Sequence, residues 1–345
     1  MCSVDICRCF FPQNPFEVAL TIALAHVMDF LYPYHSGFML KMHPVHTSYT
    51  LALKLGKPCT SKLRGVATWL IVSVLHMFAY GTALLASCIV GRWLWLITSA
   101  YILKLSMSLR LLLSIVNNVR TCFEKGDIGC ARYWTQQIVR RDVYKLGKEH
   151  VASAAIESLA ESLVDGYTSP IFYFTIGGPL AALLQRLANT LDGALGFKHG
   201  CYEDVGWFSA KADTALNFLP ARLSALIVVV YAFLAGRRVT DAYNVWRRDC
   251  RKTESINAGH PMSAMAGALG VELEKPGFYR LGNPINDASE PRTLRNAMKI
   301  AVAMAITFVA LTLLLSTLIH LALHQYINIS LKALPEICMK TFPCY

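Results

Sequence analysis

Residues 66–90 read VATWLIVSVLHMFAYGTALLASCIV, an apolar stretch that contains no acidic residue, no lysine and no arginine. A helix of about 20 apolar residues spans the hydrocarbon core of a bilayer, so this stretch is long enough to cross. Gly91 and Arg92 follow it, and residues 93–116 form a second apolar stretch of similar length. The two stretches together predict a transmembrane helical hairpin.

The composition of the whole chain agrees with a membrane protein. Of the 345 residues, 54% are hydrophobic and only 16% are charged, whereas a soluble domain carries about a quarter charged residues. Residues 16–34 and 300–324 are two further apolar stretches of near-spanning length. We therefore expect one membrane domain over residues 1–345, with about four transmembrane helices including the C-terminal one.

Two other apolar stretches are harder to place. Residues 170–188 are interrupted by Gly177-Gly178-Pro179, and residues 222–236 are short for a span. If both crossed the bilayer, residues 189–221 would lie on the opposite side from the acidic segment described below. Irregular backbone at membrane depth is tolerated where it is buried in protein, so we expect one or two re-entrant or short spans. The predicted fold class is all-α and polytopic, with cytoplasmic helical loops.

The charge distribution predicts an orientation. The chain has 33 Lys and Arg against 22 Asp and Glu, a net charge of +11. Basic residues flank the hairpin at 54–64 and 120–148, which places both flanks in the cytoplasm by the positive-inside rule. We expect a multi-pass protein of the cell membrane whose active site faces the cytoplasm. No basic patch interleaved with aromatic residues is present, so nucleic acid is not expected as a partner, whereas the lipid bilayer is.

The eleven cysteines show no metal-binding or redox motif. No pair has CxxC spacing, and Cys88, Cys122 and Cys130 lie inside apolar stretches. Buried cysteine behaves as a small apolar residue, so we expect free thiols.

The polar centre of the chain begins with Glu157-Ser-Leu-Ala-Glu161-Ser-Leu-Val-Asp165-Gly166. Residues four apart share one face of a helix, so Glu157, Glu161 and Asp165 point the same way. Like charges at that spacing repel each other, and a bound cation reverses the sign; hard divalent metals prefer carboxylate oxygens. The alternative, a solvated acidic helix face, fits less well between long apolar segments.

Further polar residues follow as far as Arg222. They are candidates for hydrogen bonds, proton transfer or phosphate binding: Asn189, Asp192, Lys198, Lys211, Asp213, Asn217 and Arg222. No GxxxxGK[ST] loop, GxGxxG fingerprint or GxSxG elbow is present, so a nucleotide would be held by metal and basic side chains. The residues alone leave two alternatives open, an enzyme or a transporter with a polar site in a membrane protein.

These motifs resemble the adenosylcobinamide-phosphate synthases, the CobD/CbiB family of cobalamin biosynthesis. The family pattern ETVAENLSDG appears here as the segment from Glu157 to Gly166. NTLD appears at 189–192, and the PAR motif ends at Arg222. A later pattern, SPNAGWPEAAMAGALGV, appears at 255–271 and includes Asn257. The likeness covers about residues 20–285, and among its departures are Lys211, Thr214 and Met262.

The resemblance implies a ligase that forms a carbon–nitrogen amide bond. Its substrates would be adenosylcobyric acid, a cobalt-containing corrinoid with a free propionate, and (R)-1-amino-2-propanol or its O-phosphate. ATP would be the cosubstrate and Mg²⁺ the metal, and other membrane-associated cobalamin-assembly enzymes would be partners. A non-catalytic regulator is a further alternative, although it would be expected to lose several motif acids together.

We assign site roles on the matched motifs as a hypothesis. Phosphates would be neutralised as charge develops, and an aspartate would take the proton of the amine. The metal ligands would be Glu157, Glu161 and Asp165, the proton acceptor Asp192 or Asp213, and the substrate- or phosphate-binding residues Asn189, Lys198, Lys211, Asn217, Arg222 and Asn257.

Overall fold

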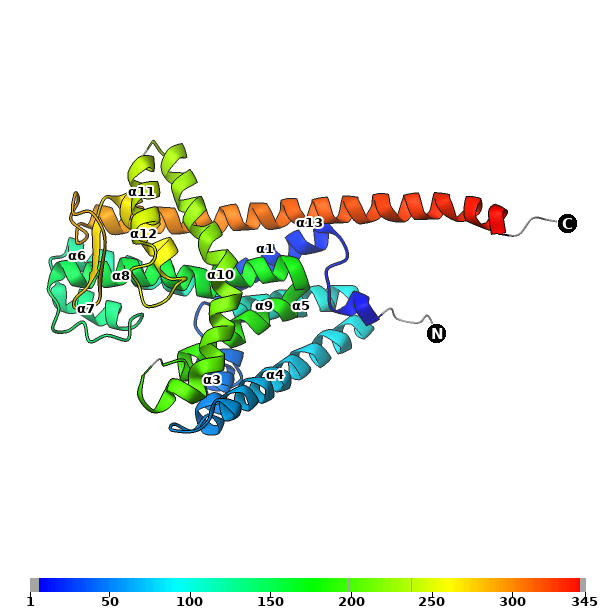
Figure 1. The fold of residues 1–345 in the computed structure, drawn as a ribbon, viewed down its shortest axis with the longest axis horizontal. Coiled ribbons are helices and arrows are strands. Elements are labelled where there is room, and N and C mark those ends of the chain that lie inside the picture. Colours follow the sequence, from blue (N-terminus) through cyan, green and yellow to red (C-terminus); the bar gives the residue numbers. More distant parts are fainter. Residues whose placement is uncertain (1–5, 198, 237, 342–345) are drawn as a thin grey trace.

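Helices dominate the part of the chain that the structure describes, and its one β-sheet is a small two-stranded hairpin (Figure 1). This computed structural model describes residues 6–197, 199–236 and 238–341, with side chains from residue 8 to residue 322. The N-terminal half contains η1 (Ile6–Cys9), α1 (Pro15–Leu31), α2 (Gly37–Lys41), α3 (Pro44–Leu55), α4 (Lys62–Val90), α5 (Arg92–Ser106), α6 (Leu109–Glu124), α7 (Ile128–Gln136) and α8 (Lys148–Leu163). The C-terminal half contains η2 (Val164–Thr168), α9 (Ser169–Leu195), η3 (Gly200–Tyr202), α10 (Glu203–Leu234), α11 (Val239–Asp249), α12 (Gly259–Leu269), β1 (Glu272–Lys275), β2 (Tyr279–Gly282) and α13 (Pro291–Thr341).

The expected all-α membrane fold is confirmed. Among the described residues, 5 helical segments are long and apolar enough to cross a bilayer, namely 62–90, 92–124, 148–195, 200–234 and 291–322. The predicted span at 16–34 is present as α1, whose 17 residues are fewer than the roughly 20 that a span needs. The strands β1 and β2 pair antiparallel, and Glu272 lies opposite Gly282.

The predicted interruption of residues 170–188 is a reversal of the chain. Within α9, Gly177 and Gly178 leave helical geometry, and Gly178 has a φ of 68°. The side chain of Gln185 reaches the backbone carbonyl of Asp165 at 3.4 Å. In a straight helix these two residues would be roughly 30 Å apart. The segment after Pro179 therefore returns alongside the one before it, as a re-entrant hairpin requires.

The predicted span 93–116 differs from the structure, because it is broken. Helix α5 ends at Ser106, Met107 is extended, and α6 starts at Leu109. The freed backbone N–H of Ser108 donates a hydrogen bond of 2.8 Å to the carbonyl of Gly166 in η2. This bond gives the broken backbone a protein partner where water is scarce, and it fixes the start of α6 against the acidic segment.

The apolar residues 222–236 are not a separate short segment. They form the C-terminal part of α10, which is continuous over 32 residues and contains Pro220. In Figure 1, α10 runs across α9 and α13 rather than alongside them. This course brings Asp213 of α10 next to Asp165 of the acidic segment. The polar residues of α10 are therefore not separated from that segment.

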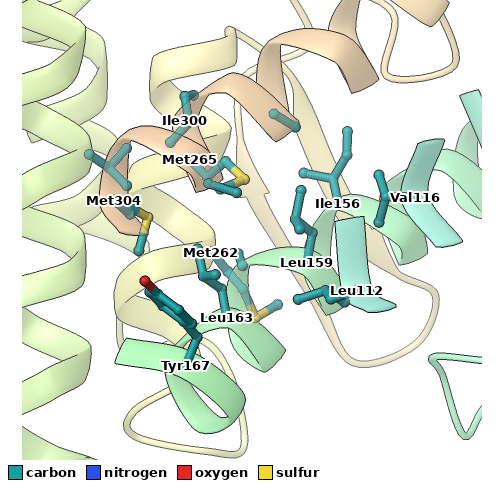
Figure 2. Packing of buried hydrophobic residues seen from close by; sticks show 14 of the residues in the cluster. Leu112, Val116, Ile156, Leu159, Leu163, Tyr167, Met262, Met265, Ile300 and Met304 are labelled. Atoms are coloured by element: carbon teal, nitrogen blue, oxygen red, sulfur yellow. The ribbon is translucent and has the colours of Figure 1, made fainter. Parts of the chain in front are cut away.

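One face of α8 is packed into the main apolar core. Ile156, Leu159 and Leu163 are fully buried, and Figure 2 shows them among residues of α6, α12 and α13 such as Val116, Met262 and Ile300. A second apolar cluster joins α3, α4, α5 and the returning arm of α9. Because the apolar face of α8 is buried in the main core, its acidic face points away from the core.

The expectation of free thiols is wrong for six cysteines. The structure pairs Cys9 with Cys88, Cys59 with Cys201 and Cys122 with Cys130, at Cα separations of 5.5, 4.2 and 5.6 Å. The first two pairs are 79 and 142 positions apart in the sequence, so only the folded chain brings them together. Cys250 is a free, half-buried thiol.

Candidate active site

The acidic helix ends in a π-helical turn that carries Asp165. Helix α8 leads directly into η2 (Val164–Thr168), which is π-helical. Such turns are rare and occur frequently at functional sites, since they widen the helix and redirect side chains. Gly166 belongs to this turn: an added Cβ would lie 2.7 Å from Ser108 Oγ and 3.3 Å from Arg186 Nη1. The glycine therefore lets the turn pack closely against both residues.

Glu157 is fully occupied by hydrogen bonds. Its Oε1 accepts bonds from Arg141 Nη2 at 2.9 Å and from Ser153 Oγ at 2.6 Å, and its Oε2 accepts one from Tyr279 OH at 2.6 Å. The carboxylate is 5% exposed, so these donors replace its lost hydration. Burial and the neighbouring carboxylate raise the pKa of Tyr279, which keeps the phenol protonated as a donor. Glu157 thus anchors α8 to the β-hairpin.

Glu161 and Asp165 have no such partners. Within the described part of the chain neither side chain makes a hydrogen bond or an ion pair. Glu161 is exposed and Asp165 is half-buried. Their charged surroundings include Arg140 and Lys275 near Glu161, and Arg186 near Asp165. These two carboxylates therefore have oxygens available for a ligand.

Asp213 joins the same cluster from α10. Its Oδ1 accepts hydrogen bonds from Asn189 Nδ2 at 3.2 Å and from Asn217 Nδ2 at 2.8 Å. Asn217, which is 1% exposed, in turn accepts bonds at its Oδ1 from Ser169 Oγ (2.6 Å) and Gln185 Nε2 (3.0 Å). A network of neutral amides thus holds Asp213 beside Asp165.

The structure brings Arg186 into the cluster, a cation that the sequence analysis did not assign to the site. Arg186 lies on the returning arm of α9, near both Asp165 and Asp213, and its Nη1 is 3.4 Å from Asn189 Oδ1. A sequence signal was present, because an arginine inside an apolar stretch is costly and marks a functional position. It also precedes Asn189 by three residues, which puts both on one helix face.

The other predicted residues lie around this cluster or outside it. Arg222 pairs with Asn257 at 2.7 Å, and Asn257 also bonds the backbone carbonyl of Thr214. Lys211 is exposed and stands two positions before Asp213, which puts it on nearly the opposite side of α10. Asp192 lies close enough to Asp165 for their charges to interact. Lys198 lies outside the described residues.

The donor set suits a metal that is shared with a substrate. Among the described residues no three His, Cys, Asp or Glu side chains form a complete ligand group. Magnesium, however, is usually held by one or two carboxylates together with substrate phosphates. Glu161 and Asp165 supply two such carboxylates, whereas the oxygens of Glu157 are already hydrogen-bonded. Two of the three predicted ligands, Glu161 and Asp165, therefore have the donor chemistry that Mg²⁺ requires, and Glu157 does not have free oxygens for it.

The sequence matches one protein family over most of its length. A family model described as CobD/Cbib protein matches residues 22–307. A probable cobalamin biosynthesis protein CobD of Aeropyrum pernix is 48% identical over 274 residues, which are 79% of this chain and 85% of that protein. A probable cobalamin biosynthesis protein CobD of Methanothermobacter thermautotrophicus is 40% identical over 62% of this chain and 71% of its own. No solved structure matches.

Proposed function

This chain belongs to the CobD/CbiB family of cobalamin biosynthesis proteins, and on that premise we propose that it is an ATP-dependent amide ligase. It would join the propionate of adenosylcobyric acid to (R)-1-amino-2-propanol or its O-phosphate. The observation that carries the proposal is the convergence of Glu161, Asp165, Asp213 and Arg186 from three segments around the π-turn.

The chemistry needs an activated carboxylate, because a carboxylate is a poor electrophile. The propionate oxygen attacks the γ-phosphorus of ATP, ADP leaves, and an acyl phosphate forms. The amine then attacks the acyl carbon, inorganic phosphate leaves, and the nitrogen loses a proton. Each step moves negative charge between phosphate oxygens, so fixed cations and a proton acceptor at the site favour it.

The residues of the cluster fit these roles. Glu161 and Asp165 would hold Mg²⁺ with the phosphates of ATP, and the metal when bound would neutralise phosphate charge. Arg186 stands beside the same carboxylates and would contact phosphate oxygens as they gain charge. Asp213, oriented by two amides, would accept the proton of the amine.

The polar half of the molecule suggests where the reaction takes place. Helices α6, α7, α8 and α11 and the β-hairpin gather at one end of the molecule, away from the long apolar run of α13 (Figure 1). Since basic residues concentrate in this half at 120–148 and 238–252, the positive-inside rule would put it in the cytoplasm, where ATP is available. The proposed location is the cell membrane with a cytoplasmic active site.

The test uses purified protein in detergent with adenosylcobyric acid, aminopropanol O-phosphate and Mg-ATP, and detects the corrinoid product by mass. We expect product from the wild type and at least a 100-fold loss in Glu161→Gln, in line with losses on removal of catalytic groups. Glu149→Gln is the matched control, because Glu149 is an exposed glutamate on the same helix. Absence of product with either amine from folded, corrinoid-binding protein would refute the ligase and favour a regulator or a transporter.

A further inference from the structure

A basic groove lies between α6 and α13, on a part of the molecule distinct from the acidic cluster. It is a cavity of about 720 Å³ that Tyr231 of α10 helps to close. Three cations line it, Arg110, Arg295 and Lys299, together with the amides of Asn117 and Asn118. No acidic side chain is among its lining residues. The groove is therefore suited to an anionic group.

A second, apolar cavity adjoins the first. It has a volume of about 420 Å³ and shares Val302 and Ile306 with the basic groove as a common wall. Among the described residues that line it, only His26 and Tyr167 have polar side chains. They bond each other at 2.7 Å, and the second ring nitrogen of His26 lies 2.7 Å from the carbonyl of Ile22. With those groups satisfied internally, the wall offers a ligand only apolar contact.

The two cavities follow one another along α13 in the direction of the membrane core. Lys299 stands at the polar end of the apolar stretch 300–324, and Leu313 in the second cavity lies 14 residues further on. At the rise of an α-helix this is roughly 21 Å, a little more than the roughly 15 Å hydrocarbon thickness of one leaflet. With Lys299 at headgroup level, as its position at the polar end of the apolar stretch predicts, the apolar end of the groove would reach acyl-chain depth.

Two of the cations are free to bind a ligand. Arg295 forms an ion pair of 3.1 Å with Glu124. Within the described residues, neither Lys299 nor the guanidinium of Arg110 forms an ion pair. Arg110 is held in place by other means. Its backbone N–H donates to Asp29 Oδ2 at 2.9 Å, and its guanidinium lies 4.9 Å from the ring of Phe30.

We propose that this groove binds one molecule of an anionic phospholipid. The phosphate would contact Arg110 and Lys299, and an acyl chain would cross Val302 and Ile306 into the apolar cavity. A cationic or zwitterionic headgroup would lack an acidic partner there, and a purely soluble anion would leave the apolar cavity empty. The far wall is Tyr167, two residues after Asp165 in η2, so the lipid would support the turn that carries the candidate site.

Native mass spectrometry on the delipidated protein in detergent tests this binding. The probes are phosphatidylglycerol and phosphatidylcholine with identical acyl chains, and inorganic phosphate as competitor. We expect phosphatidylglycerol to bind at least ten-fold tighter, because each of the two basic residues contributes about a five-fold preference for an anionic lipid. The double variant Arg110→Gln/Lys299→Gln should abolish the preference, and Lys125→Gln, an exposed lysine just beyond α6, should retain it.

A second variant tests the apolar half separately. Ile306→Trp adds bulk at the shared wall and should weaken both lipids alike, because both use the same path for the acyl chain. Equal binding of the two lipids to the wild type, or unchanged phosphatidylglycerol binding in the double variant, would overturn the proposal. Displacement of the lipid by inorganic phosphate at comparable concentration would show that the apolar cavity contributes nothing, and would overturn it too. These readouts do not depend on ligase activity.

Discussion

Asn189 donates a 3.2 Å hydrogen bond to Asp213, and this bond connects two sequence motifs that 24 positions separate. Asn189 lies on the returning arm of α9, and Asp213 lies on α10, which runs across it. The bond exists only because α9 reverses. The acidic cluster is therefore a product of tertiary structure, and changes remote from its acids should disturb it.

Asn217→Ala should impair both stability and activity. The substitution leaves Asp213 without one donor and Ser169 without its acceptor, and it removes the nearer of the two acceptors of Gln185. Unpaired buried polar groups cost about 1–3 kcal/mol each, so we expect a lower melting temperature and a more than ten-fold loss of product formation. Thermal unfolding in detergent and the ligase assay measure the two effects. Asn244→Ala, at an exposed asparagine on α11, should change neither; equal effects in both variants would contradict the assignment.

Removing Arg141 should destabilise the protein more than removing the hydroxyl of Tyr279. Arg141→Met leaves the buried carboxylate of Glu157 without its charged partner, a loss of about 3–5 kcal/mol. Tyr279→Phe removes one hydrogen bond to a charged group, worth about 1.5–3 kcal/mol. Chemical unfolding of both variants and of the double variant measures the loss in free energy of unfolding for each, and the coupling energy between the two residues. Independent, additive effects would show that the two residues do not share Glu157.

Gly178→Ala should damage the reversal in α9. The φ of Gly178 is 68°, and an added Cβ would lie 2.8 Å from the carbonyl oxygen of Phe10. Both the backbone strain and the contact oppose a side chain, at a cost of about 1–3 kcal/mol. Gly91→Ala is the matched control, because nothing lies within 4 Å of its Cβ position. A melting temperature lowered only in Gly178→Ala is the expected result, and equal melting temperatures would argue against a fixed reversal.

The protein should lose stability as the pH falls from about 6.5 to 4. Burial, with Arg222 and Arg251 nearby, lowers the pKa of His260 to about 4 from its ordinary value of 6.5. In this window the unfolded chain binds a proton that the folded chain does not, so acidification favours unfolding. His260→Gln should reduce the fall in melting temperature between pH 6.5 and 4, and the remaining fall would come in part from His43, whose pKa burial lowers to about 3; His46→Gln, at an exposed histidine, should leave the fall unchanged. A wild-type profile that is flat over this window would contradict the prediction.

Asp249 adds a second acid transition at lower pH. Burial alone would raise the pKa of Asp249, but hydrogen bonds from Arg248, Lys252 and the backbone of Gly282 lower it to about 2. Its stabilising effect is complete above its ordinary value of 3.8 and is lost as the pH falls through about 2. Asp249→Asn should therefore unfold more readily at neutral pH and show a weaker dependence on pH below 4.

The sequence predicted the features that depend on local pattern. Spacing by four put Glu161 and Asp165 on one helix face, and Gly177-Gly178-Pro179 predicted an interruption of the apolar stretch, with a re-entrant segment as one of two alternatives. Apolar length predicted the membrane fold. The break at Met107 escaped prediction because no glycine or proline marks it, and the freed N–H of Ser108 finds its partner in Gly166, which is remote in the sequence. Pairings such as Cys59 with Cys201 depend on residues 142 positions apart, which no local pattern encodes.

The candidate site likewise combines features that local sequence pattern predicts with features that depend on tertiary contacts. The acids were identified from their motif, but the reason why Glu157 differs from its neighbours lies in Arg141 and Tyr279, which come from a loop and from a strand. Arg186 likewise comes near Asp165 and Asp213 only because the second arm of α9 returns to the π-turn.

The reversal of α9 also determines on which side of the membrane the later segments of the chain begin. A segment that enters the bilayer and comes back contributes two half-crossings of opposite sense, which cancel. A label at Tyr144, before α8, and one at His199, after α9, should then be reached from the same side of the membrane by an impermeant reagent. A fusion-based map that counts 148–195 as one crossing would invert every later segment of the chain, α13 included.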